Sequence, residues 1–149
     1  MGQRQKRFPL QVPDNGWMQL GPYEMGDLEG VIALCEAEGW PSFATDPERT
    51  HRVCTAPGVT SVVARDGSEV IGFAYLQSDG EVQAHLSLIV VSRGRRREGI
   101  ARQLLQLALD RAGGQRIDLI TDSASEFYEA LPSRTMLGYR IYPPFRRVD

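Results

Sequence analysis

Residues 86–105 read LSLIVVSRGRRREGIARQLL, and this stretch determines how the rest of the chain is interpreted. It opens with an apolar run, residues 86–91, whose composition is typical of a buried β-strand. A short basic loop follows, and beyond Gly99 apolar residues recur at helical spacing: Ile100, Leu104, Leu107 and Ala108. A strand that turns directly into a helix presents the free N–H groups of the first helical turn, which together with the helix dipole favour an anion. The sequence therefore predicts an anion site at this junction.

The residues of the junction suit a pyrophosphate group. Gly99 has no Cβ and Ala101 has only a methyl group, so a ligand can approach the backbone closely. Arg96 and Arg97 add guanidinium groups, which pair well with phosphate oxygens. The GxxxxGK[ST] pattern of a P-loop is absent, and so is a GxGxxG pattern after an early strand. We therefore expect a pyrophosphate site of another type.

Residues 96–101, RREGIA, resemble the acetyl-CoA signature R/Q-x-x-G-x-G/A of the GNAT family of N-acetyltransferases. The apolar strand before them and the helix after them make the resemblance more specific than six residues alone. It implies an N-acetyltransferase that uses acetyl-CoA as cosubstrate. It also implies that the backbone of Ile89, Val90 and Val91 lies along the pantetheine arm and the thioester. The expected pyrophosphate-binding residues are Arg96, Arg97, Glu98, Gly99, Ile100, Ala101 and Arg102.

The composition is that of an ordinary globular protein, with 149 residues, 42% hydrophobic and 24% charged residues, and a net charge of −2. The one dense basic cluster, residues 93–97, has no second basic patch or aromatic platform beside it, so we predict no nucleic-acid partner. No segment approaches the roughly 20 apolar residues of a membrane span, and the N-terminus lacks the apolar region of a signal peptide. We expect a cytoplasmic protein with no membrane partner.

The two cysteines, Cys35 and Cys54, are too few for a disulfide framework or a metal site, and we predict no metal. Free cysteines in apolar or mixed surroundings are usually small core residues. Neither cysteine is near the signature, so a covalent acyl-enzyme lacks a nucleophile. Direct acetyl transfer in a ternary complex is the expected route.

The chain is predicted to have a loose N-terminal arm, residues 1–16, followed by a single domain, residues 17–149. Expected strands cover residues 17–20, 60–65, 69–77, 81–91, 117–121 and 137–142. Helices are expected after Asp27 and Asp46, from Gly99 to Ala112, and over residues 125–131, with an exposed aromatic turn at residues 40–43. This order, β-α-α-β-β-β-α-β-α-β, matches the GNAT fold, an α/β (α+β) fold with a mixed, mostly antiparallel sheet flanked by helices. In that fold the strands at 81–91 and 117–121 splay apart and admit the pantetheine arm.

Acyl transfer from a thioester to an amine needs a neutral amine, a donor for the oxyanion and a proton for the leaving thiolate. Residues 126–131, EFYEAL, resemble the family helix F/L-Y-E-x-L, whose tyrosine hydroxyl faces the cofactor sulfur. Tyr128 is therefore the expected acid, since a phenol with a pKa of about 10 can protonate a thiolate. The chain departs from the family pattern because residues 132–136 separate this helix from Gly138 and Tyr139. The alternative is that Tyr128 is a core aromatic residue.

His85 is the first candidate for the base. By two-residue alternation it shares a strand face with Ser87, Ile89 and Val91. Counted back from the signature, it falls where histone-type members of the family carry a glutamate base, and an imidazole suits that task near neutral pH. A purely structural histidine is the alternative. Glu81 acting through water, Asp118, or no residue at all are further alternatives.

The acceptor amine is less well specified by the sequence. The resemblance implies an acceptor site walled by the first two helices and the late strands. That wall carries carboxylates beside aromatic rings: Glu36, Glu38, Trp40, Phe43, Asp46 and Glu48. Such a wall would suit a cationic amine. The alternative, that these carboxylates are solvated faces of helices, is equally open. The expected partner is thus a small-molecule or peptide amine, and the resemblance is compatible with a homodimer. The rival function is a non-catalytic acyl-CoA sensor.

Overall fold

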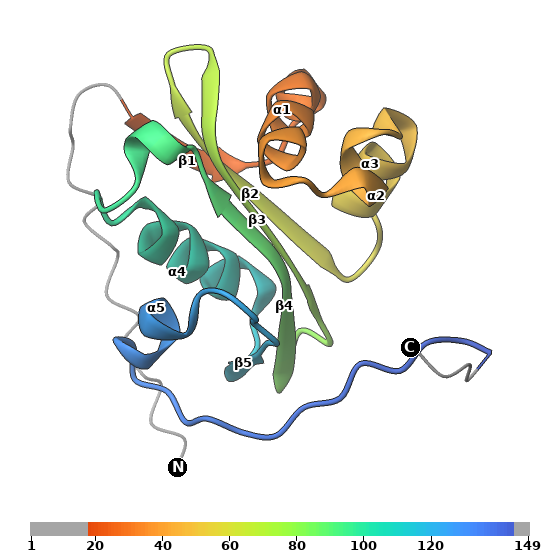
Figure 1. Ribbon diagram of the computed structural model, residues 1–149, viewed down its shortest axis with the longest axis vertical. Coiled ribbons are helices and arrows are strands. Elements are labelled where there is room, and N and C mark those ends of the chain that lie inside the picture. Colours follow the sequence, from red (N-terminus) through yellow and green to blue (C-terminus); the bar gives the residue numbers. More distant parts are fainter. Residues whose placement is uncertain (1–17, 145–149) are drawn as a thin grey trace. The chain divides into compact units, whose positions relative to one another are not determined.

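The computed structural model describes residues 18–144 (Figure 1). The chain divides into two compact units, one ending at Asp118 and one beginning at Leu119, and each is described by itself. The predicted N-terminal arm, residues 1–16, and Trp17 lie outside the described residues. Within the described residues, no helix combines the length and the apolar character needed to cross a bilayer.

The first unit is built on a five-stranded sheet in the order β1-β2-β3-β4-β5. Its strands are β1 (Met18–Pro22), β2 (Val59–Asp66), β3 (Glu69–Ser78), β4 (Gln83–Val91) and β5 (Arg116–Asp118). Neighbouring strands are antiparallel except for β4 and β5, which are parallel. The predicted mixed, mostly antiparallel sheet is therefore confirmed.

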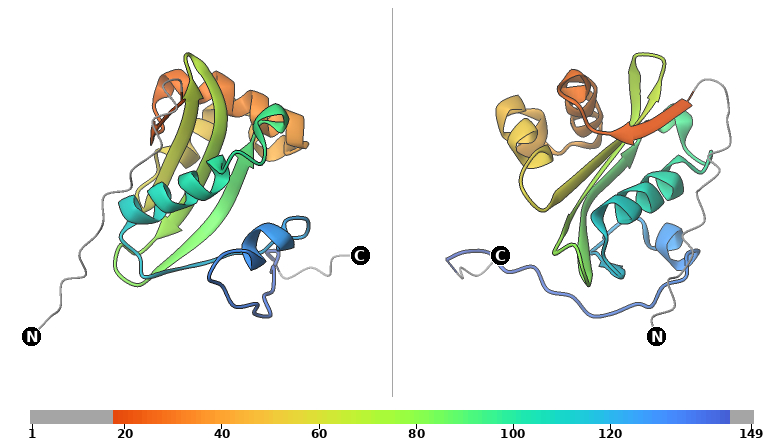
Figure 2. Two further views of the ribbon diagram at one scale, coloured as in Figure 1. Left: turned by 90° about the vertical axis from the view of Figure 1, so that its left-hand side faces the viewer. Right: turned by 180° about the vertical axis from the view of Figure 1, so that it is seen from behind.

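Helices cover both faces of this sheet (Figures 1 and 2). One face carries α1 (Leu28–Glu38), α2 (Pro41–Ala44) and α3 (Pro47–Cys54), and the other carries α4 (Ile100–Ala112). Two short 3-10 helices, η1 (Met25–Asp27) and η2 (Arg93–Arg95), precede α1 and α4. The expected exposed aromatic turn at residues 40–43 is wrong, because Pro41 starts α2 and the Trp40 ring packs half-buried against the core.

The face under α1 and α3 holds one apolar cluster that includes the predicted core cysteines. Cys35 and Cys54 are buried there with Val31, Phe73 and Tyr75, which confirms that prediction. Burial raises the pKa of each thiol to about 11. Both cysteines therefore stay protonated and inaccessible near neutral pH.

On the opposite face, α4 packs directly onto the backbone of β3. Ile100, Leu104 and Ala108 of this helix are buried, at the helical spacing that the sequence predicts. A Cβ at Gly72 would lie only 2.9 Å from Cδ1 of Leu104, closer than side chains approach one another. Gly72 thus allows the close approach that fixes α4, and with it the strand-to-helix junction, against the sheet.

Strand β4 begins at Gln83, two residues later than predicted. The carboxylate of Asp79 accepts hydrogen bonds from the backbone N–H groups of Glu81 and Val82, both at 2.8 Å, and of Gln83 at 3.2 Å. These bonds hold residues 79–82 in a turn, because an Asp side chain competes with the ladder for the same N–H groups.

The second unit contains one helix, α5 (Ser125–Glu129), and no strand within its described residues. The predicted strand at 137–142 is wrong: this segment has no ladder partner, and Leu137, Tyr139 and Ile141 are 81%, 78% and 70% exposed. Alternating apolar residues indicate a strand only where a neighbouring strand takes up the N–H and C=O groups. The strand predicted at 117–121 is likewise reduced to β5, which ends at Asp118.

A nearly buried ion pair joins the start of α1 to the sheet. Arg65 of β2 donates from Nε to Asp27 Oδ1 at 2.7 Å, and its NH2 group also contacts the Asp27 carboxylate. Asp27 also accepts from the backbone N–H of Glu24 at 2.8 Å, and Arg65 donates to the C=O of Pro22 at 3.0 Å. Burial alone would raise the pKa of Asp27, but the hydrogen bonds and the Arg65 charge outweigh it and lower that pKa.

We predict that Asp27→Asn lowers the free energy of unfolding at pH 7 by about 3 kcal/mol, the scale for removing one partner of a buried ion pair. Because the folded-state pKa of Asp27 is lowered, its stabilising effect is complete above the unfolded-state pKa of about 3.9. The effect is lost as the pH falls through the folded-state pKa. Urea unfolding at pH 7 and at pH 3 should therefore show a difference between wild type and variant that shrinks in acid. Glu29→Gln, an exposed change on the same helix, is the control and should stay within about 0.5 kcal/mol at both pH values.

Candidate functional site

The junction between β4 and α4 has two residues in left-handed backbone conformation. Gly99, the N-cap of α4, has φ +79°, and Arg97 has φ +66°. Glycine adopts this conformation at little cost, whereas a side chain at that φ is strained. The nearest atom to a Cβ built on Gly99 would be Nε2 of Gln103, at 3.9 Å, so the space beside the glycine is open.

These turns leave the first N–H groups of α4 without acceptors. The C=O of Gly99 accepts from the N–H of Gln103 at 3.2 Å, which starts the helix. No group in the described part of the chain accepts from the N–H groups of residues 99–102. Four free donors at the positive end of a 13-residue helix form a site for an anion. The geometry at this junction is that expected for an anion site, and its location stays a prediction.

One buried polar atom at this junction also lacks a partner. Oε1 of Gln103 is shielded from solvent and accepts no hydrogen bond from residues 18–144. An unpaired buried acceptor is costly unless a donor reaches it. Because coenzyme A carries both phosphates and amide N–H groups, the free helix donors and this acceptor fit such a ligand.

The arginines of the loop differ in what they contact. Arg95 pairs with Asp66 and Glu98, so it anchors the loop. Arg96 donates from Nε to the C=O of Val91 at 3.1 Å and contacts Glu38 through NH2. Arg97 and Arg102 are exposed and pair with no carboxylate among the described residues. These last two are the cations best placed to meet a phosphate.

Strand β4 has one edge that is paired only at its start. Its pairing with β5 covers three residues, Gln83 to His85, while its pairing with β3 continues to Val91. The N–H of Ser92 donates to the C=O of Ile71 at 2.8 Å. By antiparallel alternation the peptide groups of Val90 then face β3, whereas those of Ile89 and Val91 face the open edge.

Val90 thus differs from its two neighbours in the predicted cofactor-binding set. Its peptide groups bond β3 and its side chain is buried in the core cluster. Ile89 and Val91 are the residues whose backbone is directed toward the unpaired edge.

A β-bulge interrupts β4 between this edge and His85. Leu88 is opposite Tyr75, but Leu86 is opposite Leu76, so Ser87 is an extra residue with no partner. The bulge overturns the expectation that His85, Ser87, Ile89 and Val91 share one face. Below the bulge His85 is on the α1 side of the sheet; above it Ile89 and Val91 are on the α4 side.

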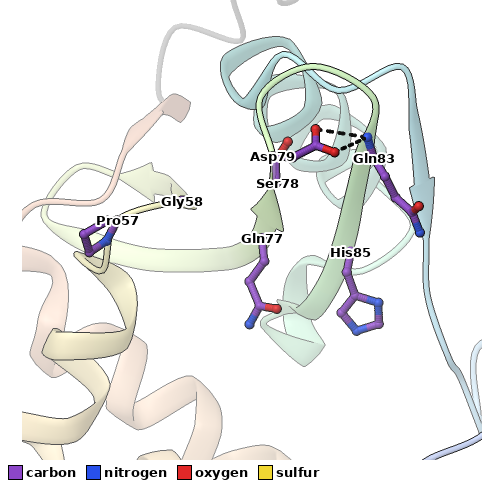
Figure 3. A pocket seen from close by; sticks show the side chains of 7 residues that line it. All are labelled: Pro57, Gly58, Gln77, Ser78, Asp79, Gln83 and His85. Carbon is purple, nitrogen blue, oxygen red and sulfur yellow. Dashed lines mark hydrogen bonds between the residues drawn. The ribbon is translucent and has the colours of Figure 1, made fainter.

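His85 lines an open cavity of about 320 Å³. Figure 3 shows the side chains of His85 and Gln77 projecting on the same side of their strands. The other lining residues come from the α3–β2 loop, from the end of β3, from the turn after it and from the start of β4: Pro57, Gly58, Ser78, Asp79 and Gln83. His85 is exposed, and no hydrogen bond joins its ring to another described residue. The cavity therefore offers an accessible imidazole beside an amide side chain.

The other candidate bases are placed differently. Asp118 is the register partner of His85 on β5, and its Oδ2 accepts from Nε2 of Gln83. Glu81 is exposed in the turn that Asp79 holds. Asp118 thus lies next to His85 in the sheet, whereas Glu81 precedes the strand.

Tyr128 is in the second unit, on α5. Its ring packs edge-on against Phe127, with 5.0 Å between the centroids, and its C=O accepts from the Ser133 hydroxyl at 2.7 Å. Burial raises the pKa of the Tyr128 phenol. The phenol is therefore protonated near neutral pH and can donate a proton.

The expected acidic wall for a cationic amine is not assembled in the structure. Its two aromatic members, Trp40 and Phe43, pack against the core, and two of its carboxylates are already paired, Glu38 with Arg96 and Asp46 with Arg49. The exposed remainder, Glu36 and Glu48, are carboxylates on helix surfaces.

Sequence reasoning missed several residues at the site. Tyr75 lies opposite the bulge, and the Ser87 hydroxyl partly offsets the rise in the Tyr75 pKa that burial causes. Gln103 lies within the α4 pattern as an ordinary polar position, and Glu38 is 58 residues from its partner Arg96. No local sequence pattern predicts such contacts.

Comparisons with known proteins identify the family. The model of the acetyltransferase (GNAT) family matches residues 28–131. No curated protein matches the chain.

Among solved structures, a Deinococcus radiodurans protein is 29% identical, with TM-score 0.66, covering 85% of this chain and 88% of its own. A ribosomal-protein-alanine N-acetyltransferase of Brucella melitensis is 14% identical, with TM-score 0.70, covering 85% and 98%. An aminoglycoside N-acetyltransferase in complex with CoA is 19% identical, with TM-score 0.68, covering 84% and 93%. The last two share the fold of this chain. With the family model matching most of its length, the chain belongs to the acetyltransferase (GNAT) family.

Proposed function

We propose that this protein transfers the acetyl group of acetyl-CoA directly to a primary amine in a ternary complex. The observation that carries the proposal is the continuous path formed by the open edge of β4 and the free N–H groups of residues 99–102. Arg97, Arg102 and those N–H groups would hold the pyrophosphate, with Glu98, Ile100 and Ala101 lining it through their backbone. Ile89 and Val91 would hydrogen-bond the pantetheine arm.

The length of β4 relates the pyrophosphate site to the reacting centre. From Val91 to the bulge at Ser87 an extended strand covers about 13 Å, at about 3.3 Å per residue. An extended pantetheine arm of similar length would bring the thioester close to the bulge. His85 follows two residues beyond, in the cavity that we propose as the acceptor site.

The chemistry then divides between two side chains. Acetyl-CoA supplies an activated acyl group, whose carbonyl carbon is attacked by the amine nitrogen while the C–S bond breaks. His85 would take the proton that the amine loses, and Tyr128 would give its phenolic proton to the departing thiolate. Cys35 and Cys54 are buried and protonated, which supports direct transfer over an acyl-cysteine.

A thiol-release assay with acetyl-CoA and a panel of amines tests the proposal. The panel comprises polyamines, aminoglycosides, amino acids and peptides with free N-termini. It covers both small-molecule and protein amines, because proteins of the same fold are named as an aminoglycoside N-acetyltransferase and a ribosomal-protein-alanine N-acetyltransferase. Turnover on one class would establish the enzyme and its acceptor. Acetyl-CoA binding by calorimetry without turnover on any class would instead favour the alternative, a non-catalytic acyl-CoA sensor.

We predict that Gly99→Glu raises the dissociation constant for CoA at least about tenfold. The side chain forces strain at a left-handed φ, and its charge repels the phosphates. Gly94→Glu is the matched control, because it adds the same charge to the same loop at a position with open space and no left-handed φ. Calorimetric titration of both variants with CoA makes the comparison. Equal affinities of wild type and Gly99→Glu for CoA would rule out the proposed pyrophosphate site.

We predict that Tyr128→Phe lowers kcat about 100-fold, the lower range for loss of a general acid, and leaves CoA affinity within about twofold. The substitution removes only the hydroxyl and keeps the ring that packs on Phe127. Tyr139→Phe, at a 78% exposed tyrosine of the same unit, is the control and should leave kcat unchanged. Steady-state kinetics with the acceptor found in the panel gives both values. An unchanged kcat in Tyr128→Phe would show that another group protonates the thiolate.

A further inference from the structure

The loop that leads into α4 is tied to the C-terminal end of α1. The NH2 group of Arg96 contacts Oε1 of Glu38, and Nε of the same guanidinium donates to the C=O of Val91 at 3.1 Å. Arg93 adds a second tie, donating to the C=O of Ala37 at 3.2 Å. The first helix therefore contacts the loop through the Glu38 side chain and the C=O of Ala37.

The burial of these groups indicates that the contact is more than a surface ion pair. The Glu38 side chain is 22% exposed, whereas those of Arg96 and Arg93 are 47% and 73% exposed. A carboxylate that is partly withdrawn from water is stabilised by a charge-assisted hydrogen bond from a partner such as Arg96. The guanidinium in turn joins Glu38 to the last carbonyl of β4, just before the chain turns.

The position of Glu38 is unexpected on electrostatic grounds. A carboxylate beside a site for a pyrophosphate repels the ligand, so simple charge counting says that removing it should strengthen binding. Its presence is explained if it fixes the loop. The strained φ of Arg97 must be held by the surrounding structure, and the loop's N–H groups must be in place before the ligand arrives.

We propose that Glu38 is a positioning residue for acetyl-CoA binding. It holds Arg96 across the C=O of Val91, and this bridge sets the turn that presents the N–H groups of residues 99–102. Arg96 acts through this bridge and not as a direct phosphate ligand, a task that falls to Arg97 and Arg102. The inference rests on the proposed function, since it assigns a role in binding the proposed cosubstrate.

The direction in which Glu38→Gln changes the affinity for CoA tests the proposal. Glu38→Gln should raise the dissociation constant for CoA about tenfold, the scale for loss of a hydrogen bond between charged groups. The effect should be the same for 3′-dephospho-CoA, which retains the pyrophosphate. Glu36→Gln, an exposed carboxylate on the same helix, reports the through-space effect alone and should leave the constant equal or slightly lower. Glu38→Asp, which keeps the carboxylate, should recover part of the affinity.

A double-mutant cycle separates positioning from direct contact. Arg96→Gln should weaken CoA binding to a similar extent, and the double variant Glu38→Gln/Arg96→Gln should be no weaker than either single variant within about twofold. Without ligand, the midpoint temperature of thermal unfolding of each variant should stay close to that of the wild type. A general loss of structure would instead lower this temperature. Affinity that is unchanged or increased in Glu38→Gln, or effects that multiply in the double variant, would overturn the proposal. Failure of the wild type to bind CoA would overturn the proposed function, and this inference with it.

Discussion

The site depends on an asymmetry in the pairing of β4. This strand is hydrogen-bonded to β3 along its whole length but to β5 through only three residues. Peptide groups in a sheet interior normally find partners on both sides, and unpaired ones are costly when shielded from water. On the open edge, the peptide groups of Ile89 and the N–H of Val91 therefore remain without a partner among the described residues, whereas the C=O of Val91 accepts from Arg96. The parallel pairing with β5 stops at His85, and that stop makes the edge available.

The packing of α4 determines where this edge leads. Gly72 lets Leu104 approach the backbone of β3, so the helix axis lies close against the sheet. Since Gly99 reverses the chain directly before the helix, the open edge and the free N–H groups of the first turn are connected by one short loop. Strand, loop and helix thus form one continuous path, which we propose as the binding site for the cosubstrate, although each element obeys ordinary rules of packing.

The charges of the loop are arranged so that only part of them is available. Arg95 is neutralised by Asp66 and Glu98, and Arg96 by Glu38. The basic cluster at residues 93–97 therefore contains three anchoring cations, Arg93, Arg95 and Arg96, and one cation, Arg97, that pairs with no carboxylate in residues 18–144. Arg102 of α4 is a second cation with no carboxylate partner among these residues. This division explains how a dense basic segment can serve one anionic ligand and still hold a fixed shape.

Local sequence patterns predicted much of the fold, because they reflect local physics. Helix α4 ends at Ala112, as predicted, because Gly113 takes up the left-handed conformation that closes a helix. The predicted break between the strands at 60–65 and 69–77 is the turn at Gly67. Contacts between distant segments were not readable in this way. The Glu38–Arg96 pair joins residues 58 positions apart, and no periodicity encodes it. The segment 137–142 shows a different error. Its apolar residues do alternate, but no partner strand accompanies it in the described residues, so the predicted strand does not form.

The bulge at Ser87 shows how a single residue separates two tasks on one strand. In an unbroken strand His85 would face the same side as Ile89 and Val91, toward α4. The extra residue places His85 on the other side, in the cavity with Gln77, while the peptide groups beyond the bulge still face the open edge. In the proposed function, the His85 imidazole on one face and the peptide groups at the edge would then approach the same point from different directions. For a reaction between two substrates that meet only at the reacting atoms, this is the arrangement that a regular strand cannot provide.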